Sequence, residues 1–148
     1  MPIGLRLADV ARDVGRAFDD ALSAAGGSRP LWMVLLALKS GAAASQQQIA
    51  DHIGIRGATL THHLSGMEQR GLVLRTREPG DRRTQVVKLT DEGERLFVAM
   101  AAAAQEFDKR LRRGLEAGEV AQLDALLQRL HANAGVQGSA LPGDVTPG

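Results

Sequence analysis

A short basic segment around residue 80 holds the side chains whose types and spacing are chemically most informative. Arg82 and Arg83 directly follow a Pro-Gly-Asp turn at 79–81. Segments of alternating apolar residues, β-branched in the second segment, flank this turn. Strands over 72–77 and 85–89 are therefore predicted, joined into a β-hairpin with a cationic tip. Because this hairpin follows a segment typical of a helix-turn-helix, the order points to a surface that grips nucleic acid.

The remaining residue types exclude several other kinds of site. The chain has no cysteine, which rules out disulfides, zinc–thiolate sites and thiol redox chemistry. It also lacks a glycine-rich phosphate loop after a strand and an acid–His–Ser set at usable spacing, so neither enzyme activity nor a catalytic residue is predicted. Neither a metal nor another cofactor is expected, because no metal-ligand spacing is found among His52, His62, His63 and His131.

The charge distribution agrees with a nucleic-acid surface. The whole chain carries a formal net charge of only +1. Between residues 56 and 88, however, seven basic residues stand against three acids, and the rest of the chain is net acidic. A basic middle with acidic flanks is typical of a DNA-facing patch on a neutral body, although the charges of one hairpin are also compatible with a merely solvated surface.

Length and composition indicate one domain with a modest core. The chain has 148 residues, and no apolar run approaches the roughly 20 residues of a membrane span. The N-terminus has acids within its first turns and no apolar block followed by a cleavage site, so it is not expected to be a signal peptide. A cytoplasmic, nucleoid-associated protein with no membrane partner is the resulting expectation.

Helical periodicity predicts two helices ahead of residue 40. Apolar residues recur at helical spacing over 7–22, and a Gly-Gly pair follows at 26–27 to end that helix. Pro30 suits the first turn of a second helix over 31–39, because its fixed φ is helical and its missing N–H has no helical partner there. Gly41 ends this second helix.

A helix-turn-helix is predicted between these helices and the hairpin. Ser45 precedes Gln48 by three residues, the spacing of a capping box, so a short third helix is expected to start there. Gly54 provides a tight turn. A fourth helix is predicted over 58–70, with apolar residues at i, i+4 and i+7 facing inward, and it would be the second helix of the motif.

Two further helices are predicted after the hairpin. Thr90 is expected to cap a helix over 91–113, which would be about 36 Å long at 1.5 Å per residue and too long for this domain to cover. Its apolar residues occupy more than one face, so it is expected to pack against another subunit. A sixth helix is predicted over 120–130, and the Gly-, Pro- and Ser-rich composition of 134–148 predicts a flexible tail.

Taken together, these motifs resemble the MarR family of winged helix-turn-helix transcriptional regulators. The helix-turn-helix is followed by E-x-R-G-L-V at 68–73, by D-R-R at 81–83 and by V-x-L-T-x-x-G at 87–93. The family pattern D-x-R-x-x-x-V-x-L-T-x-x-G is met at every fixed position. The resemblance covers about residues 5–133.

The resemblance implies a mainly α fold with a small β-hairpin wing and with dimerisation helices at both ends. Residues 30–90 would form the winged helix-turn-helix that binds double-stranded DNA, and residues 5–27 and 91–133 would form the helical dimerisation region. It also implies a homodimer on a pseudo-palindromic operator, with repression relieved by a small aromatic or phenolic effector. The alternative is a winged-helix module that binds protein without sequence-specific DNA recognition, which the basic wing disfavours.

The same resemblance assigns roles to individual side chains. The recognition helix would read base edges in the major groove through Thr59, Thr61, His62 and His63. Arg83 would enter an adjacent minor groove, with its guanidinium held by Asp81. The less favoured alternative is a local ion pair that only stiffens the turn, and both can hold together. The other residues expected to contact DNA are Ser45, Gln46, Arg56, Arg77 and Arg82.

Three positions depart from the family pattern. Arg56 stands where a capping Ser or Thr is usual, His62 replaces the usual arginine, and Gly66 falls in mid-helix at a cost of about 1 kcal/mol relative to alanine. The recognition helix is therefore expected to be poorly capped and soft until DNA orders it. Phe18 and Trp32 would line a cleft for a small aromatic effector, unless they simply belong to the core.

Overall fold

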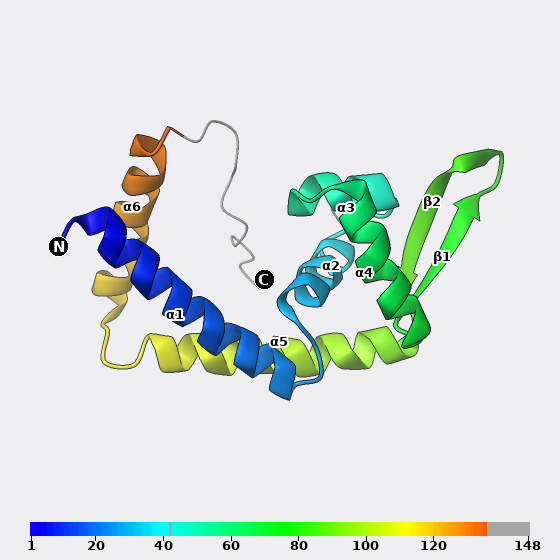
Figure 1. Ribbon diagram of the computed structural model, residues 1–148. Coiled ribbons are helices and arrows are strands. Elements are labelled where there is room, and N and C mark those ends of the chain that lie inside the picture. The colour runs from blue at the N-terminus through cyan, green and yellow to red at the C-terminus, as the bar shows by residue number, and fades with distance from the viewer. Residues whose placement is uncertain (42, 136–148) are drawn as a thin grey trace. The chain divides into compact units, whose positions relative to one another are not determined.

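Six helices and one β-hairpin make up the computed structural model, which describes residues 1–41 and 43–135. In chain order the elements are α1 (Ile3–Ala24), α2 (Arg29–Lys39), α3 (Gln46–Ile53), α4 (Gly57–Gln69), β1 (Val73–Glu78), β2 (Asp81–Leu89), α5 (Asp91–Leu111) and α6 (Ala117–Asn133) (Figure 1). The strands form a two-stranded antiparallel sheet. The predicted mainly α fold with a hairpin wing is therefore confirmed, and positions 136–148 of the predicted tail lie outside the described residues.

The chain divides into two compact units, Met1–Phe107 and Asp108–Gly148. The first unit holds α1 to α4, the wing and most of α5, and the second holds the end of α5 together with α6. Among the residues that the structure describes, no single helix is long and apolar enough to cross a membrane. Only α1 and α2 taken together, with a bend of 75° between them, meet that requirement.

The predicted start of α3 is confirmed atom by atom. Ser45 Oγ accepts a hydrogen bond of 3.1 Å from the Gln48 amide, and Gln48 Oε1 accepts one of 3.1 Å from the Ser45 amide. Both otherwise unpaired donors at the helix N-terminus are thus satisfied. The helix ends at Gly54, whose φ of 80° is the left-handed conformation that glycine adopts without steric cost.

The wing differs from its prediction at the turn. Its second strand begins at Asp81, four residues earlier than position 85, so the turn consists of Pro79 and Gly80 alone. The reason is an irregular register: Arg77 pairs with Gln85, whereas the next residue of β1 already pairs with Asp81. Three residues of β2 are therefore extruded from the ladder as a bulge, and the two consecutive arginines lie in this bulge.

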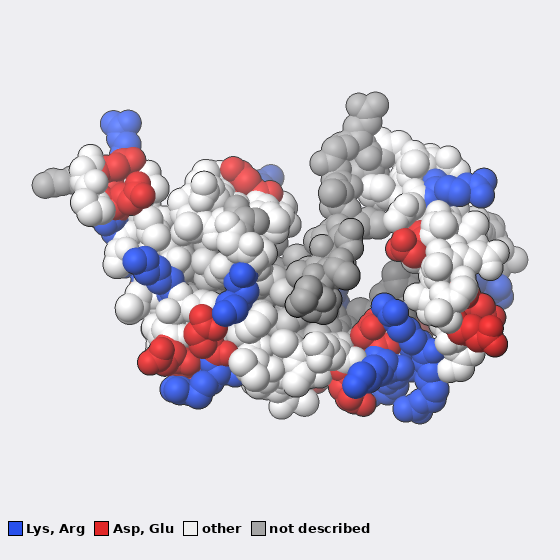
Figure 2. All heavy atoms as spheres, turned by 180° about the vertical axis from the view of Figure 1, so that it is seen from behind, with Lys and Arg blue, Asp and Glu red and all other residues white. Residues whose placement is uncertain are grey.

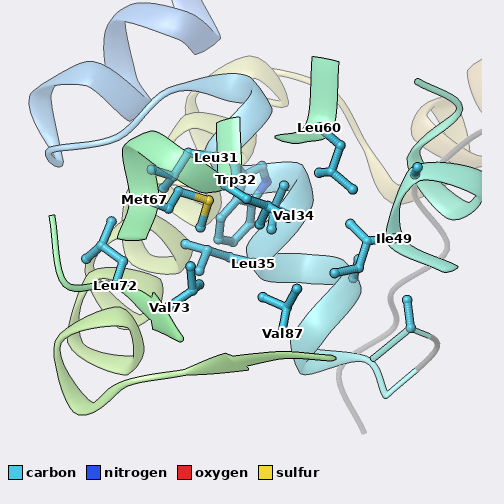
Figure 3. Close-up of a cluster of buried hydrophobic side chains, with 14 of the residues drawn as sticks. Leu31, Trp32, Val34, Leu35, Ile49, Leu60, Met67, Leu72, Val73 and Val87 are labelled. Atoms are coloured by element: carbon cyan, nitrogen blue, oxygen red, sulfur yellow. The ribbon is translucent and has the colours of Figure 1, made fainter. Parts of the chain in front are cut away.

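A single hydrophobic core joins α2, α3, α4 and the wing (Figure 3). The Trp32 side chain is 8% exposed and stacks on Phe97 of α5, with ring centroids 5.6 Å apart. Met67 of α4 belongs to the same buried cluster as this tryptophan (Figure 3). Leu60 and Leu64, also on α4, are fully buried, and burial of each such side chain stabilises the fold by about 1.5–3 kcal/mol. The core therefore fixes which face of α4 points outward.

The base of the wing, the end of α4 and the start of α5 meet at one junction. The Thr90 amide donates to the Leu72 carbonyl at 3.0 Å, and the Thr90 hydroxyl donates to the Gly71 carbonyl. The same hydroxyl oxygen accepts from the Gly93 amide at 3.1 Å, which confirms Thr90 as the cap of α5. A Cβ at Gly93 would lie 2.1 Å from the Leu72 carbonyl oxygen, so only glycine fits there. This contact gives the T-x-x-G spacing its physical reason.

Candidate nucleic-acid interface

The recognition helix α4 exposes one face because its opposite face is buried. Leu60, Leu64 and Met67, at i, i+4 and i+7, point into the core as the sequence predicts. At 100° per residue, His62 lies nearly opposite this stripe, and both Thr59 and His62 are exposed. These two predicted DNA-contacting side chains therefore lie on the accessible surface of α4.

The N-terminus of α4 has no side-chain cap. Arg56 occupies the N-cap position with extended dihedrals, but its side chain makes no capping hydrogen bond, and the first turn contains no acid. Gly66 lies in the helix interior, and a Cβ built on it would meet nothing within 4 Å. The predicted poor capping is confirmed, and α4 depends on its surroundings more than on its own helical propensity.

Thr61 is exposed, but its hydroxyl makes two hydrogen bonds to other groups of the protein. Its hydroxyl donates to the Gly57 carbonyl at 2.9 Å and accepts from Gln46 Nε2 at 2.6 Å. The hydrogen bond between Gln46 and Thr61 joins the start of α3 to the N-terminal half of α4. Among the described residues Oε1 of Gln46 is buried with no hydrogen-bond partner. Gln46 and Thr61 therefore brace the helix-turn-helix, and their predicted contacts with DNA stay predictions.

The two adjacent histidines border the same hollow but differ in exposure. His63 shares a face with Gly66 and Arg70, at i, i+3 and i+7, and this face turns towards the start of α2. A hollow of about 230 Å³ lies there, lined by Ser28, Leu31, His62, His63, Gly66, Met67 and Arg70. The imidazole centroids are 5.9 Å apart, and only His62 is classed as exposed. His63 thus lies at the edge of the exposed face of α4, and a contact of either histidine with DNA stays a prediction.

Asp81 organises the wing bulge through the backbone and not through the arginine side chain. Its carboxylate accepts from the Arg83 amide at 2.9 Å and from the Thr84 hydroxyl at 2.6 Å. These bonds, the hydroxyl first, lower the pKa of Asp81. Among the described ion pairs none joins Asp81 to the Arg83 guanidinium, so that predicted contact is wrong. The reason is geometric, because the extruded backbone turns its amide towards the aspartate, as in an Asx turn.

Fixing the backbone in this way leaves the guanidinium of Arg83 exposed. In Figure 2, which views the molecule from behind, the projecting tip of the wing at the left carries both basic and acidic atoms. Arg56 and Arg77 are also exposed, and neither takes part in the ion pairs formed among the described residues. The side chain of Arg82, also predicted to contact DNA, lies outside the described part of the structure.

A groove of about 500 Å³ separates the helix-turn-helix from the wing. Its lining is polar and comprises Ser45, Gln46, Gln47, Gly57, Thr61, Arg75, Arg83, Thr84 and Gln85. The structure thus brings four of the predicted residues, Ser45, Gln46, Thr61 and Arg83, to a single surface. Hydroxyls, amides and guanidinium groups are the donors that bind phosphate and sugar oxygens along a DNA backbone.

Sequence reasoning missed the role of Arg75. This residue of β1 forms a two-pronged ion pair with Glu68 of α4, with Nη2–Oε1 at 3.1 Å and Nε–Oε2 at 3.2 Å, and it donates to Ser65 Oγ at 3.3 Å. The hydrogen bond from Arg75 lowers the pKa of Glu68. The signal was an acid and a base on either side of the helix–strand junction, which had been counted only as charges.

The predicted effector residues lie in two separate aromatic contacts. Phe18 of α1 contacts Phe107 with ring centroids 5.2 Å apart, whereas Trp32 of α2 stacks on Phe97. Trp32 is part of the hydrophobic core and Phe18 packs at its edge. The core interpretation therefore describes Trp32, and a ligand-binding role for either residue stays a prediction.

Comparison with known proteins agrees with this arrangement. A family model described as the MarR family matches residues 28–84. The transcriptional regulator PA3341 is 31% identical with a TM-score of 0.72, covering 90% of this chain and 98% of its own. The transcriptional repressor CouR bound to a 23-mer DNA duplex is 29% identical with a TM-score of 0.77, covering 90% and 92%.

A mutant of MarR from E. coli, complexed with operator DNA, is 25% identical with a TM-score of 0.76, covering 88% of this chain and 94% of its own. The matched segment 28–84 contains the helix-turn-helix and the tip of the wing, and the structural likeness extends over the flanking helices as well. The family motif from Asp81 to Gly93 has a defined structural role at both ends, in the wing bulge and in the α5 junction. This chain belongs to the MarR family of winged-helix transcriptional regulators.

Proposed function

We propose that this protein is a homodimeric repressor that binds a pseudo-palindromic operator and releases it on binding a small aromatic or phenolic effector. The observation that carries the DNA-binding part is the polar groove between α3, α4 and the wing, bordered by the exposed guanidinium of Arg83. CouR, which has the same fold, is a repressor and was solved on a DNA duplex, and this supports the proposal. The exposed residues of α4 read the major groove while the wing enters the neighbouring minor groove.

Substitution of Arg83 tests the wing contact. Arg83→Ala should weaken operator binding by about 1–3 kcal/mol, the range for losing one good contact to a base. Thermal stability should hardly change, because the side chain is exposed and the Asp81 bonds go to the backbone. Fluorescence anisotropy on an operator selected from a random DNA library measures the effect. Arg95→Ala is the matched control, since it removes the same charge from an exposed residue of α5.

A salt titration separates DNA binding from the alternative of a protein-docking module. Binding to a random duplex should weaken steeply as salt rises, because each neutralised phosphate releases counterions. A protein-docking wing predicts no measurable duplex binding at low salt.

An Arg83→Ala variant that binds the selected operator as tightly as wild type would contradict the minor-groove role of the wing. It would leave the proposed contacts of α4 with the major groove unaffected.

Exposed apolar side chains support the homodimer. In the first unit α1 exposes a series near its start, with Ile3 at 63%, Leu5 at 61% and Val10 at 53%. In the second unit Leu123 and Leu126 of α6 are 49% and 45% exposed. Apolar residues on several faces of terminal helices need a partner surface. Sedimentation at micromolar concentration should give about twice the 15.7 kDa chain mass, and a clean monomer would overturn both the dimer and the palindromic operator.

The effector part of the proposal has its own readout. CouR from Rhodococcus jostii RHA1, 29% identical with a TM-score of 0.70, was solved bound to p-coumaroyl-CoA. Trp32 is the only tryptophan of this chain, so its emission reports on the α2–α5 contact alone. Titration with phenolic acids and their CoA thioesters should change that emission and release the operator at the same concentrations. Release without a change in emission would place the effector away from Trp32.

A further inference from the structure

Arg75 and Glu68 connect the two parts of the DNA-reading surface. Glu68 lies in the last turn of α4 and Arg75 in β1 of the wing, and their side chains meet through two nearly parallel hydrogen bonds. The Arg75 side chain is 18% exposed, against 38% or more for the cation of every other described ion pair. A two-pronged guanidinium–carboxylate pair fixes orientation as well as distance.

This pair acts on a helix that is weak by itself. Helix α4 lacks an N-terminal side-chain cap and has a glycine in its interior. Hydrogen bonds to three other segments hold it. Gln46 of α3 donates to Thr61, Arg75 of the wing donates to Glu68 near the helix end, and Arg70 at the C-cap donates from Nη2 to the Gly26 carbonyl at 2.8 Å. Of these three, only the bond from Arg75 fixes the helix relative to the wing.

Removing the negative charge of Glu68 tests its role, because two explanations predict opposite changes in DNA affinity. A carboxylate on the helix that approaches DNA repels phosphate, so electrostatics alone predict tighter DNA binding when the charge is removed. A carboxylate that orients the wing predicts the opposite for specific binding, because the wing then loses its fixed position. The two explanations of Glu68 therefore give opposite signs for one substitution.

Resting on the proposed function, we propose that Glu68 and Arg75 are specificity-determining positioning residues. They hold the wing and α4 at the separation and angle at which one lobe reaches the major groove and the adjacent minor groove together. Arg75 also lines the groove beside the wing, but in this proposal the pair acts through the position of the wing and not through its own contact with DNA. It sets which operators satisfy both contacts at once.

Three variants test the proposal: Glu68→Gln, Arg75→Gln and the charge exchange Glu68→Arg with Arg75→Glu. Binding is measured on an operator selected by the wild-type protein from a random library and on a scrambled duplex of the same composition. Glu68→Gln should weaken operator binding on the order of fivefold, as for losing a partly exposed ion pair, while scrambled-duplex binding stays equal or strengthens. The charge exchange should restore part of the operator preference. Glu92→Gln is the control, because Glu92 forms an exposed pair with Arg95 on α5.

A second readout separates positioning from general stabilisation. Each base pair of the selected operator is changed in turn, and the loss of binding affinity is measured. The losses at base pairs contacted by the wing are then compared with the losses at base pairs contacted by α4. With the Glu68→Gln variant, base changes at the operator positions contacted by the wing should alter the affinity much less than they do with wild type. Base changes at the positions contacted by α4 should alter the affinity as much as with wild type. A uniform loss at both positions, in step with a loss of thermal stability, would mean that the pair only stabilises the fold and would overturn the proposal.

Two further results would also overturn it. Tighter operator binding by Glu68→Gln would show that the carboxylate acts only as a repulsive charge. A weakening by Arg75→Gln on both duplexes, with a salt dependence reduced by about one phosphate, would make Arg75 a direct phosphate contact. Failure of the proposed function is distinct, because the wild-type protein would then select no operator at all.

Discussion

Gly66→Ala should stabilise the protein, although it changes the interior of the recognition helix. Gly66 is exposed, has ordinary helical dihedrals and offers open space where the new methyl group would go. Alanine restricts the unfolded chain more than glycine does, and in a helix interior it is favoured by about 0.8–1.0 kcal/mol. The expected gain is therefore about 1 kcal/mol, without an opposing term from steric contact.

A gain of this size is measurable by denaturation. For a chain of this length it raises Tm by about 2–4 °C. Urea unfolding at a fixed protein concentration should show a higher midpoint with an unchanged m-value, since the folded contacts stay the same. Protein concentration must be matched, because the stability of a dimer depends on it.

Gly71→Ala is the matched control at the C-terminal end of the same helix. A Cβ there also meets nothing within 4 Å, but the φ of Gly71 is +71°. An L-residue in that conformation costs about 1–2 kcal/mol, so this substitution should destabilise the protein. The same methyl group added in equally open space thus has opposite effects. A neutral or destabilising Gly66→Ala would refute the view that α4 is limited by its own propensity.

Two further outcomes follow from the contacts described. Gly93→Ala should destabilise severely, beyond the usual overpacking cost of about 1–3 kcal/mol, because its Cβ would meet the Leu72 carbonyl oxygen at 2.1 Å; thermal unfolding measures this. The hydrogen bond from Arg75 lowers the pKa of Glu68. The stability that this pair contributes is therefore fully present at pH values above the ordinary carboxyl pKa, and it is lost as pH falls through the lowered pKa. The stability difference between wild type and Glu68→Gln should therefore shrink on acidification, and a constant difference would contradict the pairing.

Local signals were sufficient for most of the fold. The S-x-x-Q spacing at Ser45, the glycine at 54 and the i, i+4, i+7 stripe of α4 each encode a structure within a few residues. Their outcome depends on hydrogen bonds and side-chain periodicity that no distant segment overrides. The same holds for Thr90, whose capping role follows from the acids and the glycine after it.

The structural features that the sequence does not predict depend on contacts between distant segments. The start of β2 was misplaced because the bulge arises from pairing across the hairpin, which residue types at 81–84 do not reveal. The hydrogen bond from Gln46 to Thr61 is another contact that the spacing on α4 does not show, because Gln46 belongs to a different helix. The ion pair between Arg75 and Glu68 also joins two elements, and the charge count alone does not reveal it. Side-chain pairing between elements is a property of the fold and not of the periodicity that predicts it.

The Thr90 junction also bears on how the chain folds. Its bond to the Gly71 carbonyl spans only 19 residues, and most of that span is the hairpin itself. Loop-closure entropy is small at such a separation, and hairpins form within about 1–10 μs. Closing the wing therefore brings the cap of α5 into place at once, so that this long helix can grow from an end that is already hydrogen-bonded. All of these hydrogen bonds lie within one chain, so the start of α5 needs no second subunit to be capped.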